Sequence, residues 1–287
     1  MAKKIRHKYL DSLNLVEVQI HGKLDFDDFD DVFSQKFESI WILADDASKF
    51  SQVTEKLKHV KAIRYNPYEK QDVTWINELP NLEYIYLSGP LKGTVDFNNF
   101  KNAREVHVDI CKTTKSILTS SISPEYLGLH KFKGDLEKLP KTMLNSVRSL
   151  YLSSTNLEHL DGLSEFSELD ELVIERNLKL TNIEGLSAQS KLKFLHIESC
   201  NKIDDYSVLS LLTVLEKFSF YNKVMPTLQL LTSKLLASIE LGPSTKLQDL
   251  DTGYFINFPS LTYVGFYNRK DYFKKLDEVK SMLDIQS

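Results

Sequence analysis

The stretch VRSLYLSSTNLEHLDGLSEF, residues 147–166, contains the pattern that decides the fold of this chain. Apolar residues alternate at Leu150 and Leu152, the polar Thr155 follows, and leucines then recur at every third residue. The pattern LxxLxLxx(N/C/T) repeats along nearly the whole chain at a spacing close to 22 residues. Its middle apolar positions are Val18, Ile40, Ile63, Ile85, Val106, Leu127, Leu150, Leu172, Leu195, Phe218, Ile239 and Val264. Successive positions are 21 to 25 residues apart, and so regular a spacing predicts a repeat architecture.

A repeat of this length and pattern resembles the leucine-rich repeat family. Residues 145–215 match best and resemble the short class, of about 22 residues, found in bacterial and intracellular proteins. The resemblance implies an α/β solenoid, curved and right-handed, with about twelve parallel strands on its concave face. Between strands, apolar residues recur at every third position, as in Ile203, Tyr206, Leu209 and Leu212. That period is typical of a 3₁₀ helix, so we expect a mostly 3₁₀ or irregular convex side.

A solenoid is one elongated unit at any length, so residues 1–287 are predicted to form a single leucine-rich repeat domain. Within it we expect an N-terminal cap at 1–14, repeats at 15–269 and a C-terminal capping helix at 270–287. The capping helix is predicted because Phe273, Leu276, Val279 and Leu283 share one helical face. Helical spacing at 51–60 and 226–239 also predicts one or two α-helical turns in each of these segments.

Composition excludes several classes of function. With 40 acidic and 36 basic residues the net charge is −4, so no overall field favours nucleic acid. The basic N-terminus lacks the apolar run of a signal peptide, and no apolar stretch is long enough to span a membrane. We therefore expect a cytoplasmic protein, monomeric on its own, that binds neither membrane nor nucleic acid.

The two cysteines fall on the ladder position that follows the LxL strand. Cys111 and Cys200 lie four repeats apart, which is about 19 Å at the spacing of adjacent strands. A disulfide requires Cα atoms within about 7 Å. We therefore expect both thiols to be reduced and buried, with a role in hydrogen bonding to the turning backbone.

The repeat also assigns the solvent-facing positions of the concave face: one before each LxL, one inside it and two after it. These positions are rich in tyrosine and other aromatic residues, which commonly anchor protein interfaces. The face is therefore predicted to bind a protein partner. Its predicted contact residues are Trp41, Tyr84, Tyr86, Glu105, His107, Asp109, Tyr126, His130, Tyr151, Glu171, Glu175, Phe194, His196, Glu198 and Tyr221.

Two groups within this face could carry chemistry. Glu175 and Glu198 occupy the same column of adjacent strands, where like charges repel. Either a cationic partner docks there or Arg176 neutralises the pair. Glu105, His107 and Asp109 alternate along one strand beside His130, which resembles a metal or acid–base site. Alternate residues of a strand are about 6.8 Å apart, however, so a polar binding patch is expected rather than a metal site.

No catalytic residue, metal site or cofactor is expected elsewhere. The acidic run at 25–31 lacks the glycine and glutamate that an EF-hand requires, and its Phe26, Phe29 and Phe33 indicate an amphipathic connecting segment. The sequence also lacks the common nucleotide-binding, metalloprotease and nucleophile-elbow motifs. An enzyme with an unrecognised site is therefore the least favoured hypothesis.

The favoured hypothesis is a non-enzymatic, cytoplasmic protein-binding module. It would act as an inhibitor or immunity-type protein that sequesters one partner with a basic surface. The alternative is a scaffold or regulatory subunit that recruits an enzyme. A fold alone does not fix a function, so these hypotheses rest on the residues of the concave face.

Overall fold

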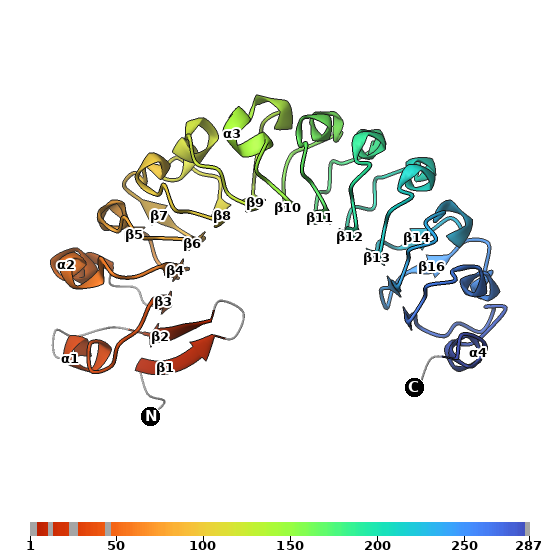
Figure 1. Cartoon of the computed structure of the whole chain (residues 1–287), viewed down its shortest axis with the longest axis horizontal. Coiled ribbons are helices and arrows are strands. Elements are labelled where there is room, and N and C mark those ends of the chain that lie inside the picture. Colours follow the sequence, from red (N-terminus) through yellow and green to blue (C-terminus); the bar gives the residue numbers. More distant parts are fainter. Residues whose placement is uncertain (1–4, 11–13, 23–27, 44–46, 285–287) are drawn as a thin grey trace. The chain divides into compact units, whose positions relative to one another are not determined.

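The computed structural model describes residues 5–10, 14–22, 28–43 and 47–284 (Figure 1). The chain divides into two compact units. The N-terminal unit contains residues 1–130 and 139–143, and the C-terminal unit contains residues 131–138 and 144–287.

The described part of the N-terminal unit is a ladder of strands in chain order. Strand β1 pairs antiparallel with β2, and all later neighbours in the ladder pair parallel. A second, two-stranded ladder pairs β5 with β7. The strands are β1 (Ile5–Leu10), β2 (Leu15–His21), β3 (Ser39–Leu43), β4 (Ala62–Tyr65), β5 (Gln71–Asp72), β6 (Tyr84–Leu87), β7 (Leu91–Lys92), β8 (Glu105–Asp109) and β9 (Tyr126–His130).

The C-terminal unit repeats this arrangement with parallel pairing between neighbouring strands. A separate small ladder pairs β14 with β16. The strands are β10 (Ser149–Ser153), β11 (Glu171–Glu175), β12 (Phe194–Glu198), β13 (Lys217–Tyr221), β14 (Val224–Met225), β15 (Ser238–Leu241), β16 (Lys246–Leu247) and β17 (Tyr263–Gly265).

The strand register confirms the predicted repeat. In the N-terminal unit Val18 pairs with Ile40, and the row continues through Ile63, Ile85, Val106 and Leu127. In the C-terminal unit the row runs Leu150, Leu172, Leu195, Phe218, Ile239 and Val264. Each of these side chains is at most 1% exposed. The repeated apolar position therefore forms one continuous row of each core, as expected of a leucine-rich repeat solenoid.

The segments opposite the strands are mostly 3₁₀ helices, as the period of three predicted. The short helix α2 confirms the turn expected at 51–60, whereas 226–239 contains the 3₁₀ helix η9 instead. None of the described helices is long and apolar enough to cross a membrane. The helices are α1 (Asp28–Val32), η1 (Ala47–Gln52), α2 (Thr54–Leu57), η2 (Thr74–Glu78), η3 (Phe97–Asn99), η4 (Lys115–Thr119), η5 (Leu136–Lys138), α3 (Lys141–Leu144), η6 (Asp161–Glu165), η7 (Glu184–Ala188), η8 (Ser207–Leu211), η9 (Leu228–Leu230), η10 (Thr252–Asn257) and α4 (Leu276–Met282).

The ends of the repeats differ from the predicted caps in detail. The capping helix α4 starts at Leu276, and Phe273 lies before it with 72% of its surface exposed, so Phe273 is not on the buried face. Val279 is fully buried, as expected. At the other end, residues 5–10 form β1, while 1–4 and 11–13 lie outside the described residues. Phe26 in the acidic run also lies outside them, and Phe29 in α1 is buried.

Polar side chains at the ladder position form hydrogen bonds between neighbouring repeats of the C-terminal unit. Asn177 accepts a hydrogen bond from the Thr155 amide at 2.7 Å, and Asn222 accepts one from the Cys200 amide at 2.6 Å. Cys200 is buried, and its thiol donates to backbone carbonyls, as predicted. Cys111 is half-exposed, so the expectation that it is buried is wrong. Beside Cys111, the Thr114 hydroxyl bonds the backbone: it accepts a hydrogen bond from the Cys111 amide and donates one to the Asp109 carbonyl.

Candidate functional site: the outer face of the strands

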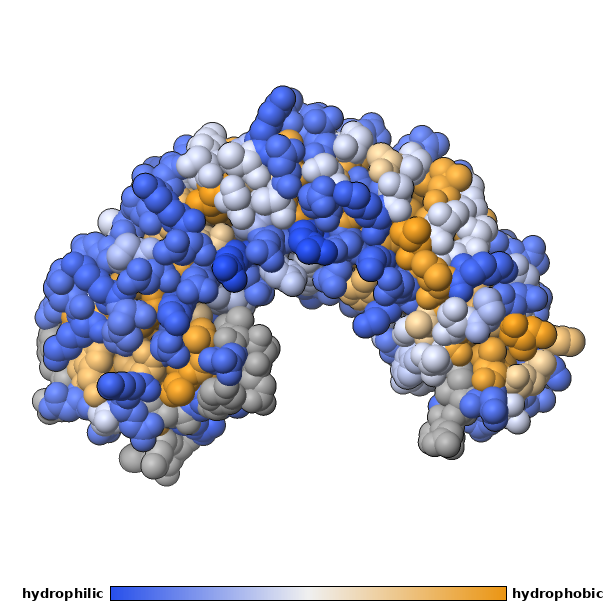
Figure 2. Space-filling model, in the orientation of Figure 1, coloured by the Kyte–Doolittle hydropathy of each residue, from blue (hydrophilic) through white to orange (hydrophobic). Residues whose placement is uncertain are grey.

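The candidate site is the set of strand side chains that alternate with the core residues, called here the sheet face of each unit. Successive side chains of a strand point to opposite sides, so a fixed register places these residues in columns. In the C-terminal unit one column runs Tyr151, Val173, His196, Ser219 and Glu240. Hydrophilic residues cover most of the surface in the view of Figure 2.

The N-terminal sheet face begins with a buried carboxylate, where exposure was expected. Glu17 is fully buried, and its oxygens accept hydrogen bonds from Gln19 Nε2 at 2.8 Å and Ser39 Oγ at 3.1 Å. The Arg64 guanidinium lies 3.1 Å from the same carboxylate. Arg64 also packs over the ring of Trp41, 5.1 Å from its centroid. The charge of Glu17 is therefore compensated within the unit.

Further along this face lies a cluster of aromatic rings. The ring of His107 lies 6.3 Å from Tyr86 and 6.4 Å from His130, and Tyr86 lies 6.5 Å from His130. His107 Nε2 is 3.0 Å from a Glu105 carboxylate oxygen. A Cβ atom added at Gly128 would lie 2.1 Å from the ring of His107, so the glycine makes room for that ring.

Asp109 does not join this cluster, although the sequence placed it on the exposed face. It is 6% exposed and accepts a hydrogen bond from the Gly89 amide at 3.2 Å. The expectation of an exposed Asp109 is therefore wrong. Its carboxylate bonds the turn after β6, because that turn brings a backbone donor within reach.

A groove of about 510 Å³ adjoins the N-terminal sheet face at the start of its strands. Tyr84, Glu105 and the exposed Tyr126 line it on one side. Burial, followed by the charge of Glu105, raises the pKa of Tyr84 to about 12. The rest of the lining includes charged residues of alternating sign, which are Glu38, Lys61, Glu83, Arg104 and Glu125.

This charged column was not among the residues predicted from the sequence. Each member lies two residues before a repeat marker, and the alternation continues in the C-terminal unit through Arg148, Asp170, Lys193 and Glu216. Lys61 pairs with Glu38 at 2.9 Å and Lys193 with Glu216 at 3.1 Å. The alternating sign was the signal that could have revealed it. Because acidic and basic residues alternate along it, this column adds little net charge, and the strand residues set the net charge of the face.

On the C-terminal sheet face, the first cluster is centred on Glu175. The Tyr151 hydroxyl donates to Glu175 Oε2, and Arg176 Nη2 lies 3.3 Å from the same oxygen. Burial, followed by this hydrogen bond, raises the pKa of Tyr151 to about 12. Arg176 follows β11 in the left-handed backbone region, with φ of 52°. Arg176 therefore contributes to neutralising Glu175, as one of the two predicted alternatives required.

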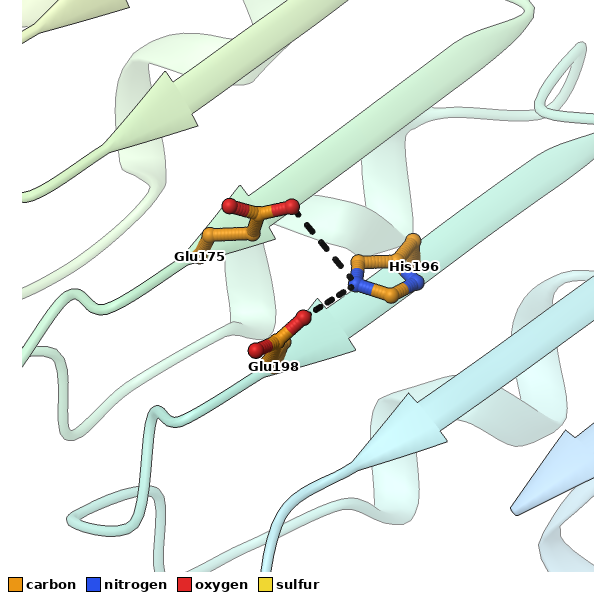
Figure 3. Close-up of side chains that lie close together, drawn as sticks. All are labelled: Glu175, His196 and Glu198. Atoms are coloured by element: carbon orange, nitrogen blue, oxygen red, sulfur yellow. Dashed lines mark hydrogen bonds and ion pairs between the residues drawn. The ribbon is translucent and has the colours of Figure 1, made fainter. Parts of the chain in front are cut away.

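His196 lies between the two carboxylates that the sequence placed in one column (Figure 3). Its Nε2 is 3.4 Å from Glu198 Oε2 and 3.9 Å from Glu175 Oε1. The side chains of His196 and Glu198 are 16% and 38% exposed, so the cluster is open to solvent. Among the described residues, these three form a His/Cys/Asp/Glu group close enough to share a metal ion, with donor atoms within 4.8 Å of one another.

The next strand supports this cluster. The Tyr221 ring lies 5.4 Å from that of His196. A Cβ atom at Gly242 would lie 2.5 Å from Tyr221 Cδ1, so this ring too rests on a glycine. Burial, followed by a hydrogen bond to Glu240, raises the pKa of Tyr221.

The remaining predicted residues of this face are Phe194, which is half-buried, and Glu171, which is exposed. They occupy the same column on adjacent strands. The structure thus links Tyr151, Glu175, His196, Glu198 and Tyr221 through successive contacts, and it holds the other two on the same strands.

Comparison with known proteins adds the class of fold. No family model matches the chain, and no curated protein matches its sequence. Among solved structures, a chain of the Drosophila Toll–Spatzle complex aligns with a TM-score of 0.50 and 11% identity, covering 94% of this chain and 46% of that chain. An internalin C2 of Listeria monocytogenes aligns with a TM-score of 0.47 and 17% identity, covering 74% of this chain and 82% of that one.

A leucine-rich repeat protein from Leptospira interrogans aligns with a TM-score of 0.36 and 13% identity, over 87% of this chain and 82% of that one. The repeat pattern, the parallel register and the buried marker rows define an α/β solenoid. The chain therefore has the leucine-rich repeat fold.

Proposed function

We propose that this chain is a non-enzymatic protein-binding module, and that the sheet face of its C-terminal unit binds a partner with a basic surface. In this proposal it is a cytoplasmic inhibitor or immunity-type protein, monomeric on its own, that sequesters one partner. The observation that carries the proposal is the charge of that face. Its strands present four carboxylates, which are Glu171, Glu175, Glu198 and Glu240. The basic residues of the face are Arg176 and Lys217.

Aromatic side chains lie among these carboxylates. Tyr151 and Tyr221 are half-buried and held by neighbours, and Tyr263 on β17 is 49% exposed. Rings already fixed in position lose little conformational entropy on binding, which is why aromatic residues often anchor interfaces. Acidic residues around such anchors attract a basic partner and speed its association.

The alternative is a scaffold or regulatory subunit that recruits an enzyme. It is favoured by one specific observation, the groove of about 510 Å³ in the N-terminal unit. Its lining carries both signs of charge, whereas the C-terminal sheet face is mainly acidic. A scaffold requires two different binding surfaces, and the two units offer them.

The test is capture of a partner from native lysate with two matched baits. In the first, Glu171→Lys and Glu240→Lys reverse charge on the C-terminal sheet face. In the control, Glu158→Lys and Glu184→Lys change exposed positions outside the strands. Circular dichroism and thermal unfolding would check that both variants fold.

A protein that the wild type and the control retain, and that the face variant loses, is the expected result. With that partner purified, the face variant should weaken binding at least tenfold, with slower association and a smaller dependence on salt. Equal retention by both variants would contradict the proposal. Loss of the partner's activity in the complex would support the inhibitor, whereas retained activity with a second bound protein would support the scaffold.

A further inference from the structure

We propose that Glu175, His196 and Glu198 form a binding site for one divalent transition-metal ion, for which Zn²⁺ is the best chemical match. The first argument is the spacing of the donor atoms in Figure 3. Zinc binds nitrogen and carboxylate oxygen at about 2.0–2.2 Å, so two ligands of a tetrahedral ion lie roughly 3.3–3.6 Å apart. His196 Nε2 lies 3.4 Å from Glu198 Oε2.

The position of Glu175 supports the same conclusion. Its Oε1 is 3.9 Å from His196 Nε2, which is too long for a hydrogen bond. The donor atoms of Glu175, His196 and Glu198 nevertheless form one small group, because all three lie within 4.8 Å of one another. An ion placed among them would draw Glu175 Oε1 inward, a movement that rotation about side-chain torsions supplies.

The surrounding residues hold the ligands in this orientation. Tyr151 and Arg176 both contact Oε2 of Glu175, which leaves Oε1 directed at His196. The ring of Tyr221 packs against His196, and Tyr221 itself rests on Gly242. Such outer contacts orient the ligands of metal sites and are commonly worth 10- to 100-fold in affinity, a general range.

The donor set also selects the metal. One imidazole nitrogen and two carboxylate oxygens suit Zn²⁺ better than Ca²⁺ or Mg²⁺, which prefer oxygen ligands alone. Because Glu198 is 38% exposed, a fourth position can be filled by water or by a group from a partner. The imidazole would bind the ion through the lone pair of Nε2.

The N-terminal unit provides a matched control. Glu105 and His107 have the same spacing along a strand as His196 and Glu198, and their side chains lie 3.0 Å apart. Among the described residues, this pair belongs to no three-ligand group of the kind found at Glu175. A histidine–glutamate pair alone should therefore bind Zn²⁺ far more weakly than the three-residue site.

The experiment titrates ZnCl₂ into the full chain, without a polyhistidine tag, by isothermal calorimetry. The variants are His196→Gln, Glu198→Gln and, as the control, His107→Gln. We expect one Zn²⁺ per chain for the wild type and the control, and an affinity at least tenfold lower for the first two variants. Tyr151→Phe, which keeps all three ligands, should weaken binding by a smaller factor.

A Co²⁺ absorption spectrum gives a second readout. The wild type should show the intense visible bands of a tetrahedral or five-coordinate ion, and His196→Gln should lose them. Failure of the wild type to bind Zn²⁺, or binding that survives His196→Gln but not His107→Gln, would overturn the proposal. No partner protein is needed, so this result stands apart from the proposed function, and Glu171→Lys with Glu240→Lys tests the latter without altering a ligand.

Discussion

The carboxylates on the sheet faces of the two units differ in their burial and in their partners. In the N-terminal unit, Glu17 is fully buried and held by Arg64, Ser39 and Gln19, and Asp109 bonds a backbone amide. In the C-terminal unit, Glu175 and Glu198 remain at the surface and converge on His196. Strand carboxylates thus form a buried ion pair in one unit and an open acidic cluster in the other. The difference lies in the neighbouring side chains.

The largest expected effect tests this contrast between two arginines. Arg64→Met should lower the free energy of unfolding by about 3–5 kcal/mol, because it leaves the buried carboxylate of Glu17 without its cation. Arg176→Met should cost less than about 1 kcal/mol, because the Arg176 side chain is 60% exposed and surface ion pairs contribute little. Urea unfolding of both variants measures the two values, and equal losses would contradict the contrast.

The second prediction concerns the part that the units share, their buried rows. Leu172→Ala and Ile85→Ala should each cost about 2–5 kcal/mol, through lost burial and the cavity that remains. The control Leu178→Ala should lower the free energy of unfolding by only a few tenths of a kcal/mol, because Leu178 is 65% exposed. Urea unfolding again provides the measurement. A small loss at either core position would mean that the repeat register is wrong in that unit.

The fold was predictable because these rows recur in the sequence. A residue such as Leu195 occupies a position that every repeat must fill with an apolar side chain, so a single sequence suffices to find it. The 3₁₀ segments followed from the period of three for the same reason. The start of α4 was harder to predict from the sequence, because Phe273 fits the helical pattern yet lies before the helix.

The site was only partly predictable, because exposure depends on contacts between repeats. The register places Glu17 in a column of the sheet face, but Arg64, two strands away, reaches across and covers it. Likewise, alternate residues of a strand are about 6.8 Å apart at the backbone, which argued against a shared ion. The side chains of Glu105 and His107 nevertheless converge to 3.0 Å and those of His196 and Glu198 to 3.4 Å, and only coordinates reveal this.

A third prediction uses one tyrosine from each face. Tyr84 and Tyr151 have pKa values raised to about 12, so the folded state holds their protons more tightly than the unfolded state does. Their contribution to stability is fully present below about pH 10 and is lost as the pH rises through about 12. Ultraviolet titration of the phenolate should show a late-ionising signal, reduced in Tyr84→Phe and in Tyr151→Phe. The control variant is Tyr68→Phe, which removes an exposed tyrosine.

A smaller effect distinguishes the two thiols. Burial raises the pKa of Cys200 to about 11, and Cys111 is half-exposed. Cys111 should therefore react with iodoacetamide in the native protein, and Cys200 only after denaturation. Mass spectrometry of the labelled peptides measures both rates. Labelling of Cys200 in the native protein as fast as that of Cys111 would contradict the difference in burial.

The central claim is that a protein partner binds the sheet face of the C-terminal unit. Site-specific photocrosslinking tests it most directly, with p-benzoylphenylalanine placed singly at Phe194, at Tyr126 on the N-terminal sheet face, or at Leu211 in η8. Leu211 is 57% exposed and lies away from the strands. We predict that, in native lysate, the probe at Phe194 yields a discrete adduct that Glu171→Lys with Glu240→Lys abolishes. An adduct formed only from Leu211 or Tyr126, or one unaffected by the charge reversal, would contradict the account.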